Sequence, residues 1–226
     1  MKTITDCHVN IWNPGQLTAL LRGQMARMRP DATPGVLADA DTLFEAMAGV
    51  CKAIVFPIRY GDSAGVESDD ETCVRHDLPL TMHMGTTFAR NAPIELGRAI
   101  HVEPVALRYP DLKLICAHMG HPWYEETIAV VRKQPNVVCE ISALFYRPWQ
   151  FWNILACAQE YRMTDKIFFG TDFPFSGVQE SIDGLKNVNR VVEGTGLPRT
   201  AADVIDGILH SSPFEHWWHR PLRFPS

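Results

Sequence analysis

The sequence lacks long apolar runs and any cluster of basic residues. The longest apolar stretches, residues 52–58 and 112–119, are far shorter than the roughly 20 residues that a membrane-spanning helix needs. Residues 1–5 also lack the apolar region of a signal peptide. Lys and Arg number 21 and Asp and Glu 26, a formal charge of −5 that offers no basic patch to nucleic acid or to an anionic membrane. We therefore expect a cytoplasmic protein that binds a small molecule.

The cysteine pattern gives no sign of disulfide bonds. The six cysteines include no CxxC pair, and several lie in apolar segments, where an unpaired cysteine behaves as a small hydrophobic residue. No repeat or low-complexity segment interrupts the chain. These absences argue against a disulfide scaffold, and 226 residues with 46% apolar content favour a single globular domain over residues 1–226.

Short apolar segments alternate with longer amphipathic ones, which is the pattern of βα units around a parallel sheet. Six strands are expected, at residues 3–11, 52–58, 79–84, 112–118, 136–143 and 166–172. Helices are expected at residues 39–49, 94–109, 124–133, 149–162, 178–194 and 201–210. The connection from Arg59 to Asp77 is anomalous because it is polar and offers only a brief helix near residues 71–77, whereas a parallel crossover usually contains a packed helix.

Four of the expected strands end in residues that bind metals. The four segments are DCHVN (6–10), MHMG (82–85), AHMG (117–120) and GTDFP (170–174). In an α/β barrel the carboxyl ends of the strands form the active-site face. Because side chains alternate along a strand, His8 and Asn10 are expected to face the barrel axis, and Cys7 and Val9 the helices.

Together, His8, His83, His118 and Asp172 suit one divalent metal ion. Three imidazoles and a carboxylate favour Zn²⁺, with Mn²⁺ or Fe²⁺ as alternatives. Such an ion lowers the pKa of a bound water to about 7, and a neighbouring carboxylate can accept its proton. Taken singly, a strand-end histidine is more often structural, and Asp172 could cap a helix. A shared metal would satisfy all four groups at once.

Five stretches of the sequence carry a resemblance to a known family: DCHVNIW, LPLTMHMGT, YPDLKLICAHMGHPW, QPNVVCEIS and DKIFFGTDFPF. In this order they resemble the amidohydrolase-2 branch of the metal-dependent amidohydrolases, which includes aminocarboxymuconate-semialdehyde-type decarboxylases and related lactonases. The resemblance implies a TIM-type (β/α) barrel. It implies that His8 and His83, from the first and fifth strands, bind one metal together with Asp172 from the eighth. His118 matches the sixth-strand histidine, an acid–base or electrostatic group, so Asp172 and His118 are the expected catalytic residues.

Two departures from the family pattern stand out. The first motif is usually His-x-His or Glu-x-His, whereas Asn10 occupies the second position here. An amide oxygen is a weaker ligand, so Asn10 either shifts the preference toward Mn²⁺ or takes no part. The third and fourth barrel strands also have no counterpart, because the motifs make residues 52–58 the second strand and 79–84 the fifth. We expect a barrel short of two central βα units, with two edges that a dimer partner could cover.

Four further residues are candidates for substrate binding. Arg90 could bind a carboxylate through two hydrogen bonds, and His121, Tyr146 and Phe173 follow strand ends near the expected site. Each also has a structural interpretation, as a surface charge or as core packing.

Three functions remain open at this stage. The first is a metal-dependent hydrolase of a small carboxylated or lactone-like substrate, and the second is a non-oxidative decarboxylase on the same fold. The third is a binding protein that has lost catalysis. Fold alone does not separate them.

Overall fold

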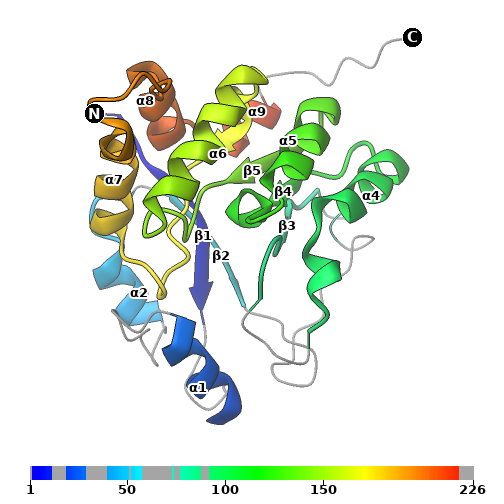
Figure 1. Ribbon diagram of the computed structural model, residues 1–226. Coiled ribbons are helices and arrows are strands. Elements are labelled where there is room, and N and C mark those ends of the chain that lie inside the picture. Colours follow the sequence, from blue (N-terminus) through cyan, green and yellow to red (C-terminus); the bar gives the residue numbers. More distant parts are fainter. Residues whose placement is uncertain are drawn as a thin grey trace.

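Six parallel strands form the centre of the computed structural model, at the six places that the sequence predicts (Figure 1). The structure describes residues 2–11, 19–28, 40–50, 52–57, 73, 77–87 and 92–218. The strands are shorter than predicted: β1 (Thr5–Ile11), β2 (Lys52–Pro57), β3 (Leu80–Met82), β4 (Leu114–Cys116), β5 (Val137–Glu140) and β6 (Ile167–Phe168). The α/β class with a parallel sheet is therefore confirmed.

The strands follow one another in the order β2, β1, β6, β5, β4, β3. Strands β3 to β6 pair in sequence order, and β1 pairs with β2. The segment that follows β6 joins the two groups, since Cys7 N donates to Phe169 O, Asp172 N to His8 O and Asn10 N to Phe173 O, each at 2.9 Å. The result is an arc of a barrel with β2 and β3 at its ends.

Within the described residues no strand pairing joins β2 to β3, so the barrel is not closed there. This agrees with the expected absence of the third and fourth barrel strands, which would lie between them. Most of the connecting segment, residues 58–72 and 74–76, lies outside the described residues.

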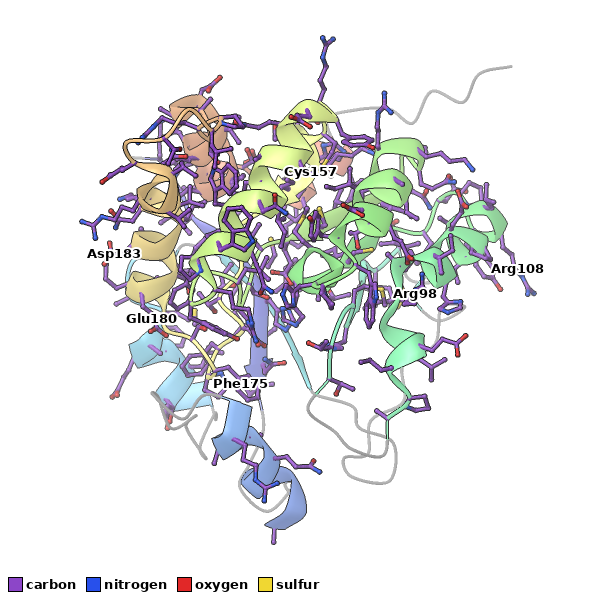
Figure 2. All side chains as sticks on the ribbon, in the orientation of Figure 1. Arg98, Arg108, Cys157, Phe175, Glu180 and Asp183 are labelled. Carbon is purple, nitrogen blue, oxygen red and sulfur yellow. The ribbon has the colours of Figure 1, made fainter. Side chains whose placement is uncertain are left out.

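Helices cover the outer face of the arc. Figure 1 shows α5 and α6 against β4 and β5, with α7 and α8 beside β1. Charged side chains such as Arg108 and Asp183 project outward from these helices (Figure 2). The helices are α1 (Ala19–Met28), α2 (Ala40–Ala46), α4 (Val102–Arg108), α5 (Tyr124–Lys133), α6 (Pro148–Glu160), α7 (Val178–Lys186), α8 (Ala202–His210) and α9 (Pro213–Trp218). No helix among the described residues is long and apolar enough to cross a membrane.

Two predicted helices are each divided into shorter segments. The region 94–109 contains two 3₁₀ turns, Ile94–Gly97 and Ala99–His101, before α4 begins at Val102. Pro104 explains this start, because proline lacks an N–H and fits only the first turn of a helix. The region 178–194 is likewise divided, with α7 ending at Lys186 and a 3₁₀ turn at Val188–Val192. Helices α1 and α9 were not predicted.

A β-bulge in β1 changes which way Cys7 faces. Asp6 pairs with Ala53 and Val9 with Val55, so Cys7 and His8 together lie opposite the single residue Ile54. A bulge breaks the alternation of side chains. Cys7 consequently packs on the inner face with Ile115, Val138, Phe168 and Trp217, rather than toward the helices, and the prediction for Cys7 was wrong.

Trp217 of α9 closes the inner face of the arc. Its side chain packs against the inward residues of β4, β5 and β6. The larger apolar cluster lies on the other face, where Leu114 and Cys116 meet Ile128 of α5 and Val102 of α4. Apolar layers on both faces explain why these short strands contain almost no polar residue before their carboxyl ends.

The side chain of Asn136 joins the start of β5 to the end of α4 through hydrogen bonds. The residue is buried, and its side-chain amide donates to the carbonyls of Leu112 (2.9 Å), Tyr109 (3.1 Å) and Ala106 (3.4 Å). These carbonyls lie in the last turn of α4 and in the segment after it, where helical hydrogen bonds are no longer available.

We predict that Asn136→Ala lowers the free energy of unfolding by about 2 kcal/mol, because buried carbonyls lose their donor. Urea unfolding followed by circular dichroism measures the change. Asn187→Ala is the matched control, since Asn187 also donates to one backbone carbonyl, that of Asp183, but at an exposed position. Equal losses in the two variants would contradict the assignment.

Candidate metal centre

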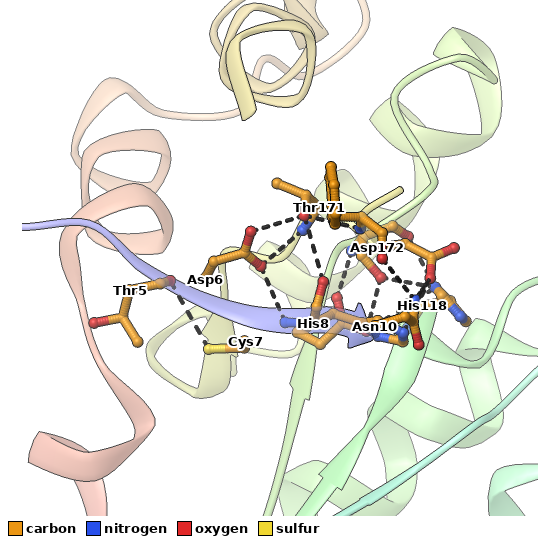
Figure 3. A network of polar contacts seen from close by, with 11 residues as sticks. Thr5, Asp6, Cys7, His8, Asn10, His118, Thr171 and Asp172 are labelled. Atoms are coloured by element: carbon orange, nitrogen blue, oxygen red, sulfur yellow. Dashed lines mark hydrogen bonds and ion pairs between the residues drawn. The ribbon is translucent and has the colours of Figure 1, made fainter. Parts of the chain in front are cut away.

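The polar residues of the strand ends meet at the carboxyl end of the arc (Figure 3). His8 lies on the bulge of β1, His118 follows β4, and Asp172 follows β6. One ligand atom from each of these three side chains lies within 4.8 Å of the other two. His8 Nε2 and Asp172 Oδ1 are 3.1 Å apart, and the ring centroids of His8 and His118 are separated by 4.7 Å. Residues far apart in sequence thus form one cluster of metal-binding groups.

Glu140, at the end of β5, holds two of these side chains in place. Its Oε1 accepts hydrogen bonds from the ring of His8 (2.9 Å) and from the backbone N–H of His118 (2.8 Å). The hydroxyl of Ser142 donates to the same oxygen at 2.9 Å, and the Ser142 backbone N–H donates to Oε2. Glu140 is fully buried. A carboxylate that orients a metal-binding imidazole in this way is a common feature of metal sites.

The sequence analysis did not identify Glu140, although this residue follows the apolar run VVC in a stretch that resembles the family. A carboxylate at the end of a strand buried on both faces is itself a signal. Such a group must find several donors, and the carboxyl end of the sheet is where they gather.

Opposite charges dominate the electrostatics around His8. Burial by itself lowers the pKa of this imidazole, but the carboxylates of Asp172 and Glu140 raise it to about 10. Burial likewise raises the pKa of Glu140, yet the charge of His8 and its hydrogen bond bring it down to about 2. Two carboxylates therefore face one imidazole from opposite sides. The negative charge around His8 suits a divalent cation.

The ring of His118 is oriented by Ser142. Its Nδ1 lies 2.8 Å from Ser142 Oγ and 3.1 Å from Ser142 O. Because the Ser142 hydroxyl already donates to Glu140, Nδ1 carries the proton and donates to Ser142. Nε2 of neutral His118 then keeps its lone pair for a metal or a proton. His118 (φ 54°) and Asp172 (φ 65°) both adopt left-handed backbone conformations, a form of strain that is typical of functional sites.

Asp6 and Thr171 join the bulge of β1 to the segment after β6 (Figure 3). Asp6 Oδ1 accepts from the backbone N–H groups of His8 and Thr171, each at 3.0 Å, and Oδ2 accepts from the Thr171 hydroxyl at 2.7 Å. Burial raises the pKa of Asp6 to about 6 despite these hydrogen bonds. Asp6 lies two residues before His8, and Thr171 adjoins Asp172. The hydrogen bonds between Asp6 and Thr171 therefore set the spacing between His8 and Asp172.

Gly170 leaves room for this arrangement. A Cβ at this position would lie 2.5 Å from Glu140 Oε2 and 3.1 Å from the Cβ of His8. Any larger residue would therefore displace Glu140 or His8.

The side chain of Asn10 contacts the carboxylate of Asp172. Its amide nitrogen donates to Asp172 Oδ1 (2.8 Å) and to Phe173 O (3.0 Å). Both partners are acceptors, which fixes the orientation of the amide. In this structure Asn10 orients the Asp172 carboxylate.

The structure places His118 nearer than His83 to the other candidate ligands. His118 belongs to the set of converging ligand atoms, whereas His83 lies beside it with the ring centroids 5.0 Å apart. His83 Nε2 is 3.2 Å from Thr86 O. The surrounding protein and the neighbouring His118 lower the pKa of His83. His83 therefore borders the site from the edge strand β3.

The expected substrate-binding residues are only partly placed. Arg90 lies outside the described residues. His121 is half-buried and its Nε2 is 2.7 Å from Gln150 Oε1. Tyr146 is half-buried, with its ring edge-to-face against Phe145. Phe173 is buried, and its carbonyl accepts from the backbone and side chain of Asn10.

The sequence matches the family model described as amidohydrolase over residues 46–210, well over half of the chain. The chain belongs to this amidohydrolase family. No curated protein matches it. The family assignment confirms the resemblance on which the TIM-type fold was predicted.

Several solved structures share the fold of this amidohydrolase. A zinc-bound amidohydrolase from Burkholderia multivorans matches with a TM-score of 0.59 and 16% identity, covering 97% of this chain and 100% of the other. A manganese-bound dihydroxybenzoic acid decarboxylase from Polaromonas sp. JS666 matches at 0.57 and 14%, covering 99% and 100%. A protein provisionally named 2-pyrone-4,6-dicarboxylic acid hydrolase, from Pseudomonas putida, matches at 0.55 and 10%, covering 96% and 98%.

We predict that Glu140→Gln lowers the affinity for Zn²⁺ or Mn²⁺ by about 10- to 100-fold, because His8 loses the anion that orients it. Competition with a chromogenic chelator measures the affinity. Glu103→Gln is the matched control, since Glu103 also pairs with neighbouring side chains, Lys133 and Gln134, but on α4. An unchanged affinity in Glu140→Gln would contradict the orienting role.

Proposed function

We propose that this amidohydrolase is a metal-dependent hydrolase of a small carboxylated or lactone-like substrate. The observation that supports it is the convergence of His8, His118 and Asp172, whose ligand atoms lie within 4.8 Å of one another at the carboxyl end of a parallel sheet. The substrate is a small molecule, in keeping with a formal charge of −5.

His8, His118 and Asp172 would hold the cation, with Glu140 and Asn10 fixing two of the three ligands. When bound, a divalent ion acts as a Lewis acid on a carbonyl or phosphoryl oxygen and lowers the pKa of a water molecule. Two imidazoles and a carboxylate suit Zn²⁺ best, and Mn²⁺ and Fe²⁺ accept the same ligands.

Asp172 is the proposed acid–base residue. Its Oδ1 is engaged by Asn10 and His8, whereas Oδ2 makes no hydrogen bond to the described residues. Oδ2 can therefore take a proton from the attacking water and return it to the leaving group. His118 is held through Nδ1 by Ser142, which leaves Nε2 as its ligand atom for the cation.

A decarboxylase is the second candidate. The Polaromonas relative carries that activity in its name on the same fold. In this case the same residues would position a carboxylated substrate, and Asp172 would deliver a proton to the carbon that loses carbon dioxide. Reaction products separate the two activities.

The direct test incubates the purified protein with Zn²⁺ or Mn²⁺ and a panel of lactones and hydroxylated aromatic acids. Titration of released acid reports hydrolysis, and carbon dioxide release reports decarboxylation. We expect acid release without carbon dioxide. Carbon dioxide release without ring opening would assign the decarboxylase, and a folded protein that binds neither metal would overturn both activities.

We predict that Asp172→Asn lowers the turnover of an identified substrate by about 10²- to 10⁴-fold, because the amide cannot accept the proton. Steady-state kinetics at saturating metal measures the effect. Asp183→Asn serves as the control, since Asp183 is an exposed carboxylate on α7. Comparable loss in both variants would show that the effect is not local to the site.

A further inference from the structure

Arg147 differs from the other arginines of the protein. Among the arginines whose side chains are described, only Arg98 and Arg147 are not largely exposed. Arg98 forms a two-pronged ion pair with the carboxylate of Glu126. Arg147 has no carboxylate partner within the described part of the chain. A partly buried cation without an anion is unusual, because burial weakens its hydration.

Arg147 lies on the loop between β5 and α6, at the same end of the sheet as the metal centre. Its Nη1 donates to the carbonyl of Ala143 at 2.8 Å, and its guanidinium lies 4.5 Å from the centre of the Tyr146 ring. The neighbouring carbonyl, that of Ser142, accepts from the ring of His118. The consecutive carbonyls of Ser142 and Ala143 therefore accept from the imidazole of His118 and the guanidinium of Arg147.

His121 brings a second nitrogen group to the same place. Its ring contacts Gln150, which lies in the first turn of α6 just after Arg147. Burial lowers the pKa of His121, and the charges of Arg147 and His118 lower it further. The ring thus lies within the electrostatic reach of both residues. His118, His121 and Arg147 form a nitrogen-rich border next to the metal centre.

We propose that Arg147, with His121 beside it, binds a carboxylate of the substrate distinct from the group that reacts at the metal centre. The inference rests on the proposed function, because it assigns the ligand of the same site. Guanidinium binds a carboxylate through two parallel hydrogen bonds. One N–H group of Arg147 is engaged by Ala143, which leaves donors for this pairing. Stacking on Tyr146 holds the guanidinium plane in place.

The substrate class that follows is a small anion with at least one carboxylate besides its reacting carbonyl or carboxyl group. An uncharged lactone or ester would leave Arg147 without a partner and would be bound more weakly. Arg90, for which the sequence suggests a similar role, lies outside the described residues.

The test measures binding of benzoate and of its uncharged analogue benzamide by isothermal titration calorimetry, with metal-free and metal-loaded protein. We expect Arg147→Met to weaken benzoate binding by about 10- to 100-fold in both forms, the range of a hydrogen bond to a charged group. Arg147→Lys keeps the charge without the planar fork and should fall between wild type and Arg147→Met. Benzamide binding should not change.

Arg132→Met is the matched control. Arg132 also stacks on a tyrosine ring, that of Tyr161, but lies in the last turn of α5. Its replacement should leave benzoate binding unchanged.

Benzoate binding by Arg147→Met at wild-type strength would overturn the proposal, as would wild-type protein that binds benzamide and benzoate equally. Should Arg147→Met fail to fold, Arg147→Lys decides, because unchanged benzoate binding by that variant also overturns it. Metal affinity is measured in parallel. Loss of metal binding with retained, Arg147-dependent benzoate binding would remove the proposed function and leave the carboxylate site.

Discussion

The candidate site depends on one buried carboxylate. Glu140 lies at the end of a strand covered on both faces, so its charge must be balanced by nearby donors. The ring of His8 and the backbone of His118 and Ser142 supply them. In meeting this requirement, the protein brings together the strand ends of β1, β4 and β5. The same hydrogen bonds that stabilise the buried charge therefore orient two metal-binding imidazoles. Gly170 is part of the constraint, because only glycine leaves Glu140 its space.

The arrangement of the strands explains why an open barrel can keep such a site. The cluster uses β1, β6, β5 and β4, which are four consecutive strands of the arc. The two strands at the ends of the arc, β2 and β3, contribute none of its three converging ligand atoms. His83 follows β3 and lies at the border of the cluster. Within the described residues, the region between β2 and β3, where the third and fourth barrel strands of the family would lie, therefore contributes no member of the set. Two hydrogen bonds between Asp6 and Thr171 strengthen the junction of β1 with the segment after β6, which few backbone hydrogen bonds join.

The sequence predicted the strands and the face on which the chemistry lies, because apolar strands with polar ends are a strong local signal. His8, His118 and Asp172 were identified in this way. It did not predict the bulge at Cys7, since an extra residue in one strand is defined only by its partner strand. Nor could it separate His83 from His118. Both follow apolar strands in HMG segments, and only the positions of β3 and β4 in the arc distinguish them. Glu140 was not predicted, because a pattern of candidate ligands does not mark the groups that orient those ligands.

The charges around the site relate the fold to the substrate that it would bind. Around His8 the carboxylates of Asp172 and Glu140 create a negative environment that suits a cation. On the loop after β5, Arg147 creates a positive environment, with no carboxylate paired to it among the described residues. A substrate that bridges the two regions must therefore bring an electron-rich oxygen to the first and a negative charge to the second. Such a polarity also orders the substrate in one direction, because reversing it would place its anionic end against the two carboxylates. The residues that recognise the substrate and those that would act on it are then set apart by charge, while the Ser142–Ala143 backbone fixes the spacing between them.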